Sequence, residues 1–194
     1  MGAKAAAGPG KSSSARERLL AAANELFYDE GVHTVGIDRV IERAGVAKAS
    51  LYNTFGSKDE LVRAYLEMRH ARIAARITRY LERYSTPRER LLGVFEAQGE
   101  TFADPAFRGC AFVAASAESP GESVTRAADD NRGWVRGLFT GLAREAGAAD
   151  PELLARQLHM IYDGASLSVR LDRNPVASAM ARAAAETLLD AACR

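Results

Sequence analysis

The chain has 194 residues, of which 47% are hydrophobic and 26% are charged, and its formal net charge at pH 7 is +1. This length supports one sizeable core plus a small second domain, and the near-neutral charge balance by itself gives no argument for a nucleic-acid partner. Two cysteines, Cys110 and Cys193, exclude a disulfide framework and a clustered metal site, and indicate a reduced compartment, which we expect to be the cytoplasm.

Residues 1–14 are predicted to form a disordered basic arm, because they consist mostly of Ala, Gly, Ser and Pro with two lysines, Lys4 and Lys11. The arm lacks the apolar segment of a signal peptide, and Ala6 stands where a myristoylation signal needs Ser or Thr. No run in the chain approaches membrane-spanning length, so no membrane partner is expected. The arm lysines either follow a DNA minor groove or have no specific role.

The rest of the chain is predicted to be all-α, since apolar residues recur at helical spacing and no β-type alternation is present. Three short helices are expected first, from about Ala15 to Gly31, Ile37 to Ala44 and Lys48 to Phe55. The Ser57–Glu60 capping box then opens a long helix to about Tyr84. Pro and Gly divide the remainder into the ranges 87–103, 105–118, 122–147, 151–171 and 175–192.

These elements, about nine helices in all, predict two domains. Residues 15–60 form a three-helix head and residues 61–194 a larger helical bundle. Within the head, residues 36–55 have the helix-turn-helix pattern, in which Gly45 supplies the positive φ of the sharp turn.

The spacing within the helix-turn-helix separates an inner face from an outer one. The residues predicted to face the first helix are Val40, Ile41, Val46 and Leu51. The residues left facing outward on the second helix are Lys48, Ala49, Ser50, Asn53 and Thr54. Small and polar side chains there allow the helix to enter a major groove, so double-stranded DNA is the expected partner.

The run from Ala44 to Leu61, AGVAKASLYNTFGSKDEL, closely resembles the signature of TetR-family transcriptional regulators. The resemblance implies that Lys48, Ala49 and Ser50 open the recognition helix. It further implies that Tyr52 and Lys58 contact phosphates, which set register and most of the affinity. The chain departs from the family at Thr54, where His is frequent, and at Gly36, where many members carry a Ser or Thr cap.

The resemblance also implies a larger domain with an effector cavity and a dimer interface, because one head alone binds too few base pairs. The cavity candidates are Tyr65, Met68, Phe95, Phe102, Phe112, Trp134, Phe139, His159 and Tyr162. The dimer candidates, on two late helices rich in small residues, are Leu154, Leu158, Ile161, Ala165, Leu188 and Leu189. Each aromatic residue is alternatively a packing residue, and the late helices alternatively close the core of the monomer.

Within the bundle, His159 and Asp163 lie one helical turn apart, where they either meet a ligand or satisfy each other. Cys110 lies in an Arg-Gly-Cys-Ala-Phe segment similar to a Gly-Cys element of one family branch, and it is either a pocket or oxidant-sensing residue or an inert buried thiol.

The sequence therefore predicts a ligand-responsive homodimeric repressor that binds a palindromic operator and is released by a small-molecule effector. No cofactor or metal is expected, and no catalytic constellation is present, which argues against a helical enzyme. The remaining alternatives are a helical sensor or partner-binding protein that has lost specific DNA binding, and an activator in place of a repressor. Neither the effector nor the operator follows from the sequence.

Overall fold

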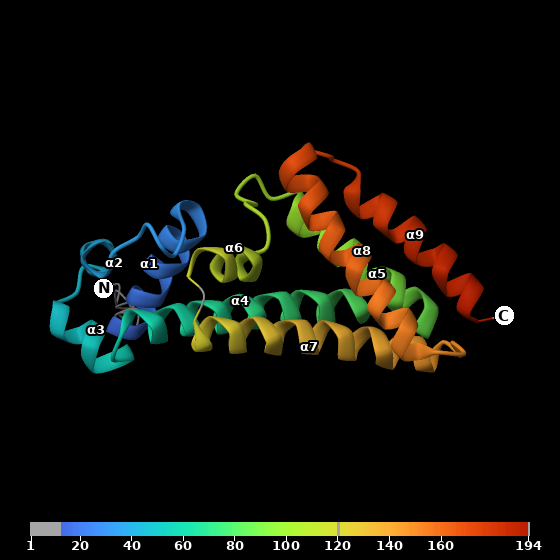
Figure 1. Cartoon of the computed structure of the whole chain (residues 1–194), viewed down its shortest axis with the longest axis horizontal. Helices are drawn as coiled ribbons and strands as arrows, with labels where there is room; N and C mark the ends of the chain where they lie inside the picture. The colour runs from blue at the N-terminus through green and yellow to red at the C-terminus, as the bar shows by residue number, and fades with distance from the viewer. Residues whose placement is uncertain (1–12, 120, 194) are drawn as a thin grey trace, which may run out of the picture. The chain divides into compact units, whose positions relative to one another are not determined.

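The computed structural model describes residues 13–119 and 121–193, which form nine helices and no strand (Figure 1). The helices are α1 (Ala15–Glu30), α2 (Ile37–Ala44), α3 (Lys48–Phe55), α4 (Lys58–Leu81), α5 (Pro87–Phe102), α6 (Ala111–Glu118), α7 (Glu122–Glu145), α8 (Pro151–Asp172) and α9 (Ala177–Ala192). The all-α prediction is confirmed. Most of the predicted basic arm, with Lys4 and Lys11, lies outside the described residues.

Helix α6 begins six residues later than the position of Pro105 predicts. The reason is a local turn, in which the Asp104 carboxylate accepts the backbone N–H of Ala106 at 2.8 Å and the Asp104 carbonyl accepts that of Phe107 at 2.9 Å. A side chain that bonds its own backbone in this way competes with helix formation. Helix α4 likewise ends at Leu81, earlier than expected.

The chain divides into two compact units, one running to Tyr65 and the other starting at Leu66, so that α4 contributes to both. This division lies five residues beyond the boundary predicted at residue 60, because the first turns of α4 bury their apolar side chains in the head. Tyr65 is 1% exposed and its ring meets that of Phe27 edge-on at 5.7 Å.

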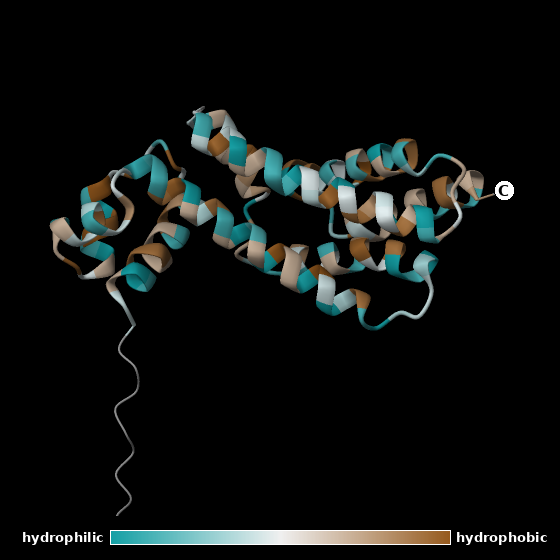
Figure 2. Cartoon of the chain, turned by 90° about the horizontal axis from the view of Figure 1, so that it is seen from below, coloured by the Kyte–Doolittle hydropathy of each residue, from teal (hydrophilic) through white to brown (hydrophobic). Residues whose placement is uncertain are grey.

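The second unit is built around a core in which α5, α7, α8 and α9 pack together. Phe95, Phe139, Leu154, Leu158 and Leu189 are among its fully buried side chains. Apolar and polar residues alternate along these helices (Figure 2), as expected when each helix buries one face only.

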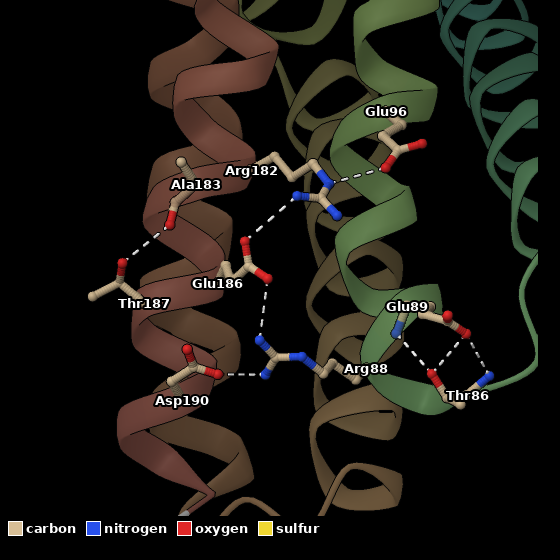
Figure 3. Close-up of polar contacts among 9 residues, drawn as sticks. All are labelled: Thr86, Arg88, Glu89, Glu96, Arg182, Ala183, Glu186, Thr187 and Asp190. Atoms are coloured by element: carbon tan, nitrogen blue, oxygen red, sulfur yellow. Dashed lines mark hydrogen bonds and ion pairs between the residues drawn. The ribbon is translucent and has the colours of Figure 1, made fainter.

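Helix α9 is held on α5 by a chain of ion pairs (Figure 3). Arg88 contacts Glu186 at 3.2 Å and Asp190 at 2.5 Å, and Arg182 contacts Glu96 at 3.0 Å and Glu186 at 3.5 Å. Each pair is solvent-accessible and contributes at most about 1 kcal/mol. The network therefore sets the register of the two helices more than it adds to stability.

A tyrosine ring approaches the backbone of α5 closely at Gly93. A Cβ atom at this position would lie 2.5 Å from Cε2 of Tyr84, so only glycine lets that ring lie against the helix. The Tyr84 hydroxyl donates to the Glu96 carboxylate, which also binds Arg182. The packing at Gly93 thus supports one end of the ion-pair network.

Two kinds of feature are absent from the described residues. No helix there is both long and apolar enough to span a membrane. In the same ranges no group of three or more His, Cys, Asp or Glu side chains is arranged to hold a metal ion.

Candidate nucleic-acid interface and ligand site

The helix-turn-helix is fixed to α1 by two bidentate ion pairs. Arg43 on α2 binds the Glu25 carboxylate of α1 at 2.7 Å, and Arg39 forms a similar fork with Glu30. At the turn, Gly45 has φ 62° and ψ 42°, the left-handed conformation that the sequence predicts there. The ion pairs therefore hold α2 on α1, and the conformation of Gly45 sets the direction in which the chain leaves α2 toward α3.

Helix α3 is anchored on one side and exposed on the other. Leu51 is fully buried and Val40 of α2 is buried with it, as predicted. The outer face carries Tyr52, whose side chain is 45% exposed, together with Lys48, Ala49, Asn53 and Thr54, which are all exposed. Ser50 and Lys58 are partly exposed. The structure therefore places all seven predicted DNA-binding residues where solvent reaches them.

Lys48 has an acidic neighbour that the sequence analysis missed. Its ammonium group lies 2.9 Å from the Asp38 carboxylate at the start of α2, and this hydrogen bond raises the pKa of Lys48. Both side chains are exposed, at 61% and 81%. The lysine is therefore charged at neutral pH, and any phosphate that binds it must compete with Asp38.

The two departures from the family pattern have clear structural settings. The Thr54 hydroxyl donates to the carbonyl of Ser50 at 2.6 Å, one turn back along α3. Gly36 is the N-cap of α2 and provides no side-chain cap, and a Cβ atom there would meet nothing within 4 Å. The first backbone N–H groups of α2 consequently lack the side-chain acceptor that Ser or Thr would supply.

The nine predicted cavity residues do not all lie together. Tyr65 belongs to the core of the first unit, against Phe27. In the second unit, the Tyr162 ring lies 6.3 Å from that of Phe95 and 6.2 Å from that of Phe139. Phe95 and Phe139 stack on each other at 5.6 Å, so these three rings form one aromatic cluster.

The remaining cavity candidates are dispersed through the second unit. Trp134 is partly buried and meets His70 edge-on at 5.5 Å. Phe102 lies 5.1 Å from Phe107, between ring centroids. Phe112 is buried at the start of α6, and Met68 is partly buried on α4.

Polar side chains gather beside the aromatic cluster. His159 is 4% exposed and lies 3.7 Å from Asp163, which binds Arg132 at 2.7 Å. Burial lowers the pKa of His159, although the Asp163 charge opposes this shift. Burial raises the pKa of both the Tyr162 hydroxyl and the Cys110 thiol, so both are protonated at neutral pH.

Gln98 and Arg76 complete this polar group and were not predicted. The Gln98 amide is 4% exposed and donates to the Tyr162 carbonyl at 2.7 Å, and the Arg76 guanidinium donates to the Thr101 hydroxyl. Periodicity could not reveal them, because a polar residue on an inward helix face looks like an irregularity until the neighbouring helices are known.

The predicted dimer residues lie on the inner side of their helices. Leu154, Leu158, Ala165 and Leu189 are between 0% and 6% exposed within the chain's own core, and Ile161 and Leu188 pack against the same core. The exposed apolar side chains of this region are different ones: Leu153, Met160, Leu167 and Leu171 on α8, and Val176 and Met180 at the start of α9. These exposures contradict the dimer residues predicted from the sequence. They indicate that a dimer contact would use the outer face of α8 and the start of α9 instead.

Comparison with known proteins gives concordant results for the head and for the whole chain. Residues 19–65 match the family model described as bacterial regulatory proteins, tetR family. The crystal structure of a TetR-family transcriptional regulator from Streptomyces coelicolor is 34% identical and superposes with a TM-score of 0.86, covering 93% of this chain and 96% of that one.

Two curated relatives differ in how much they share. The transcriptional activator FasR of Mycolicibacterium smegmatis is 39% identical over 82 residues, which is 42% of this chain and only 37% of FasR. The transcriptional repressor NemR of Escherichia coli is 28% identical over 180 residues, or 86% of this chain and 90% of NemR. The structure of reduced NemR superposes with a TM-score of 0.79.

Proposed function

Because the chain belongs to the TetR family of transcriptional regulators, we propose that it acts as a homodimeric repressor whose two heads bind a palindromic operator and which an effector releases. The observation that carries the proposal is the outer face of α3. It presents Lys48, Tyr52 and Asn53 to solvent on a helix whose opposite side is fixed to the head by Leu51. A helix anchored in this way can enter a major groove without disturbing its own core.

The dimer proposal depends on the outer face of α8. Leu153, Met160 and Leu167 follow one another at seven-residue spacing, so they form a stripe along one side of the helix, with Gly164 between them. Each is at least half exposed. In a two-fold symmetric dimer, the stripe of one copy would pack against the identical stripe of the second copy, and both would be covered.

The effector is proposed to bind in the second unit, beside the aromatic cluster of Phe95, Phe139 and Tyr162. Helix α4 contributes to both units, so a shift of its second half can be transmitted to the head. Release requires that the effector bind the DNA-free state more tightly than the DNA-bound state. We place this activity in the cytoplasm, where the DNA is.

The test is a fluorescence-anisotropy titration with the DNA upstream of the chain's own gene, repeated over a salt series. Tyr52→Ala and Lys48→Glu should abolish specific binding, and the wild-type affinity should fall steeply with salt. Arg126→Gln, an exposed arginine on α7 that pairs with Glu122, is the matched control and should bind DNA normally. Equal affinity of wild type and both head variants would favour a sensor that has lost specific DNA binding.

One relative supports a second regulatory outcome. FasR is named an activator and is 39% identical over its matched segment. Transcription in vitro from the bound promoter separates the two: a repressor lowers transcript yield when it binds, and an activator raises it.

A further inference from the structure

In the described part of the chain, Arg76 is held by a hydroxyl and not by a carboxylate. It lies on the second half of α4, is partly buried, and donates to the Thr101 hydroxyl of α5. Among the described residues no carboxylate forms an ion pair with it. Arg79, one turn further along α4, is by contrast 60% exposed and pairs with Glu100 of α5 at 3.7 Å. A guanidinium that is partly removed from water and lacks a counter-charge favours an incoming anion.

Gln98 lies three residues before Thr101 on α5 and adds an unused acceptor. Its amide nitrogen donates to the Tyr162 carbonyl at 2.7 Å and to the Ser166 hydroxyl at 3.1 Å, both on α8. Its Oε1 atom is buried and has no hydrogen-bond partner among the described residues. The two donor bonds fix the orientation of the amide, so Oε1 points away from these α8 acceptors. A buried acceptor left unpaired is costly unless a donor arrives from a ligand.

Two of the other charged groups nearby cancel each other. Arg132 and Asp163 form an ion pair at 2.7 Å, and burial lowers the pKa of His159, which keeps its ring neutral at pH 7. The Tyr162 hydroxyl stays protonated and is within the electrostatic influence of Arg76. The group as a whole therefore retains positive charge, from Arg76 and from Arg136 of α7, whose charge also lowers the pKa of His159. A neutral hydroxyl donor, that of Tyr162, lies near Arg76.

The apolar side of the site comes from aromatic rings. Tyr162 bridges the two features, because its ring contacts those of Phe95 and Phe139 while its backbone carbonyl binds Gln98. A ligand placed here would meet rings on one side and polar groups on the other. Ring faces and edges favour a flat or aromatic body.

From these contacts we infer that the second unit binds an amphipathic organic monoanion. Its carboxylate pairs with Arg76, a hydroxyl or amide N–H donates to Gln98, and its apolar body lies against the ring of Tyr162. This inference rests on the proposed function, for which it names the chemical class of the effector.

The probes are four compounds that share one ring and differ in head group or donor. Hydroxyphenylpropionate carries both the carboxylate and the hydroxyl donor, phenylpropionate lacks the donor, hydroxyphenylpropionamide lacks the charge, and tyramine has the opposite charge. Each is titrated into the full chain without DNA by calorimetry. Fluorescence of Trp134, the single tryptophan of the chain, gives a second readout from within the same unit.

We expect the hydroxylated carboxylate to bind roughly ten- to a hundredfold more tightly than its amide, and tyramine to bind most weakly. Arg76→Gln should remove this preference, while Arg79→Gln, on the same helix, should leave it unchanged. Gln98→Met should weaken the hydroxylated carboxylate roughly fivefold and leave phenylpropionate unaffected. Thermal melting of each variant shows that it is folded.

Equal affinity for the carboxylate and the amide overturns the inference, as does stronger binding of tyramine or binding of none of the four. DNA binding is measured separately by anisotropy. Specific DNA binding together with no preference for anions refutes the effector class alone. Anion binding with no specific DNA binding refutes the regulatory function and leaves the ligand site standing.

Discussion

Replacing Met160 with alanine should weaken the dimer by an amount that its exposure allows us to estimate. Complete burial of a methionine side chain contributes roughly 1.5–3 kcal/mol. Because Met160 is 74% exposed in the single chain, about three quarters of this, ~1–2 kcal/mol, is available for association. A two-fold interface contains the residue twice, so Met160→Ala should cost about 2–4 kcal/mol, which is roughly a 30- to 1000-fold increase in the dimer dissociation constant.

Sedimentation velocity over a wide concentration range measures this constant directly. Val113→Ala is the matched control, since Val113 is an apolar side chain on α6 that is 50% exposed and lies outside α8 and α9. The control should dimerise like the wild type, and circular dichroism should show both variants folded. An unchanged dimer constant for Met160→Ala, or an equal loss for Val113→Ala, would show that the outer face of α8 is not the interface.

Three further changes test other parts of the chain. Gly93→Ala should lower the free energy of unfolding, measured in urea, by about 1–3 kcal/mol, because the added methyl group collides with a tyrosine ring. Gly137→Ala, at an open position of α7, should raise the same free energy by about 0.5–1 kcal/mol. Asp38→Asn should tighten DNA binding roughly two- to fivefold in anisotropy by freeing the lysine that opens α3, and weaker binding would contradict the proposed competition. At pH 8 Ellman's reagent should modify exposed Cys193 well before Cys110, because burial raises the pKa of Cys110 and keeps it in the thiol form; equal rates would revive an oxidant-sensing role.

The head could be predicted in detail because its determinants are local in sequence. Gly45 needs a left-handed conformation, and Leu51 takes the inward position that helical spacing assigns to it. The helix limits of α2 and α3 follow from the same few residues. The pairing of Lys48 with Asp38 could not be predicted from the sequence. Both residues are exposed, and helical periodicity identifies only residues on a buried face.

The outer face of α8 could not be identified from periodicity, because the helix carries apolar residues on two sides. Leu154 and Leu158 turn toward the core, while Leu153 and Met160 turn to solvent, and the sequence alone gives no reason to prefer one set as the core. The choice is made by the neighbouring helices. Packing against α7 and α9 assigns one side to the monomer and leaves the other exposed.

The same reasoning explains why the proposed ligand group had no sequence signature. Its polar members come from α4, α5, α7, α8 and the start of α6, and no short motif can encode such a convergence. Arg76 meets Thr101, and Gln98 meets Tyr162 and Ser166, only once α4, α5 and α8 have packed together. The group therefore forms together with the core of the second unit, and its members cannot be recognised before that packing is known.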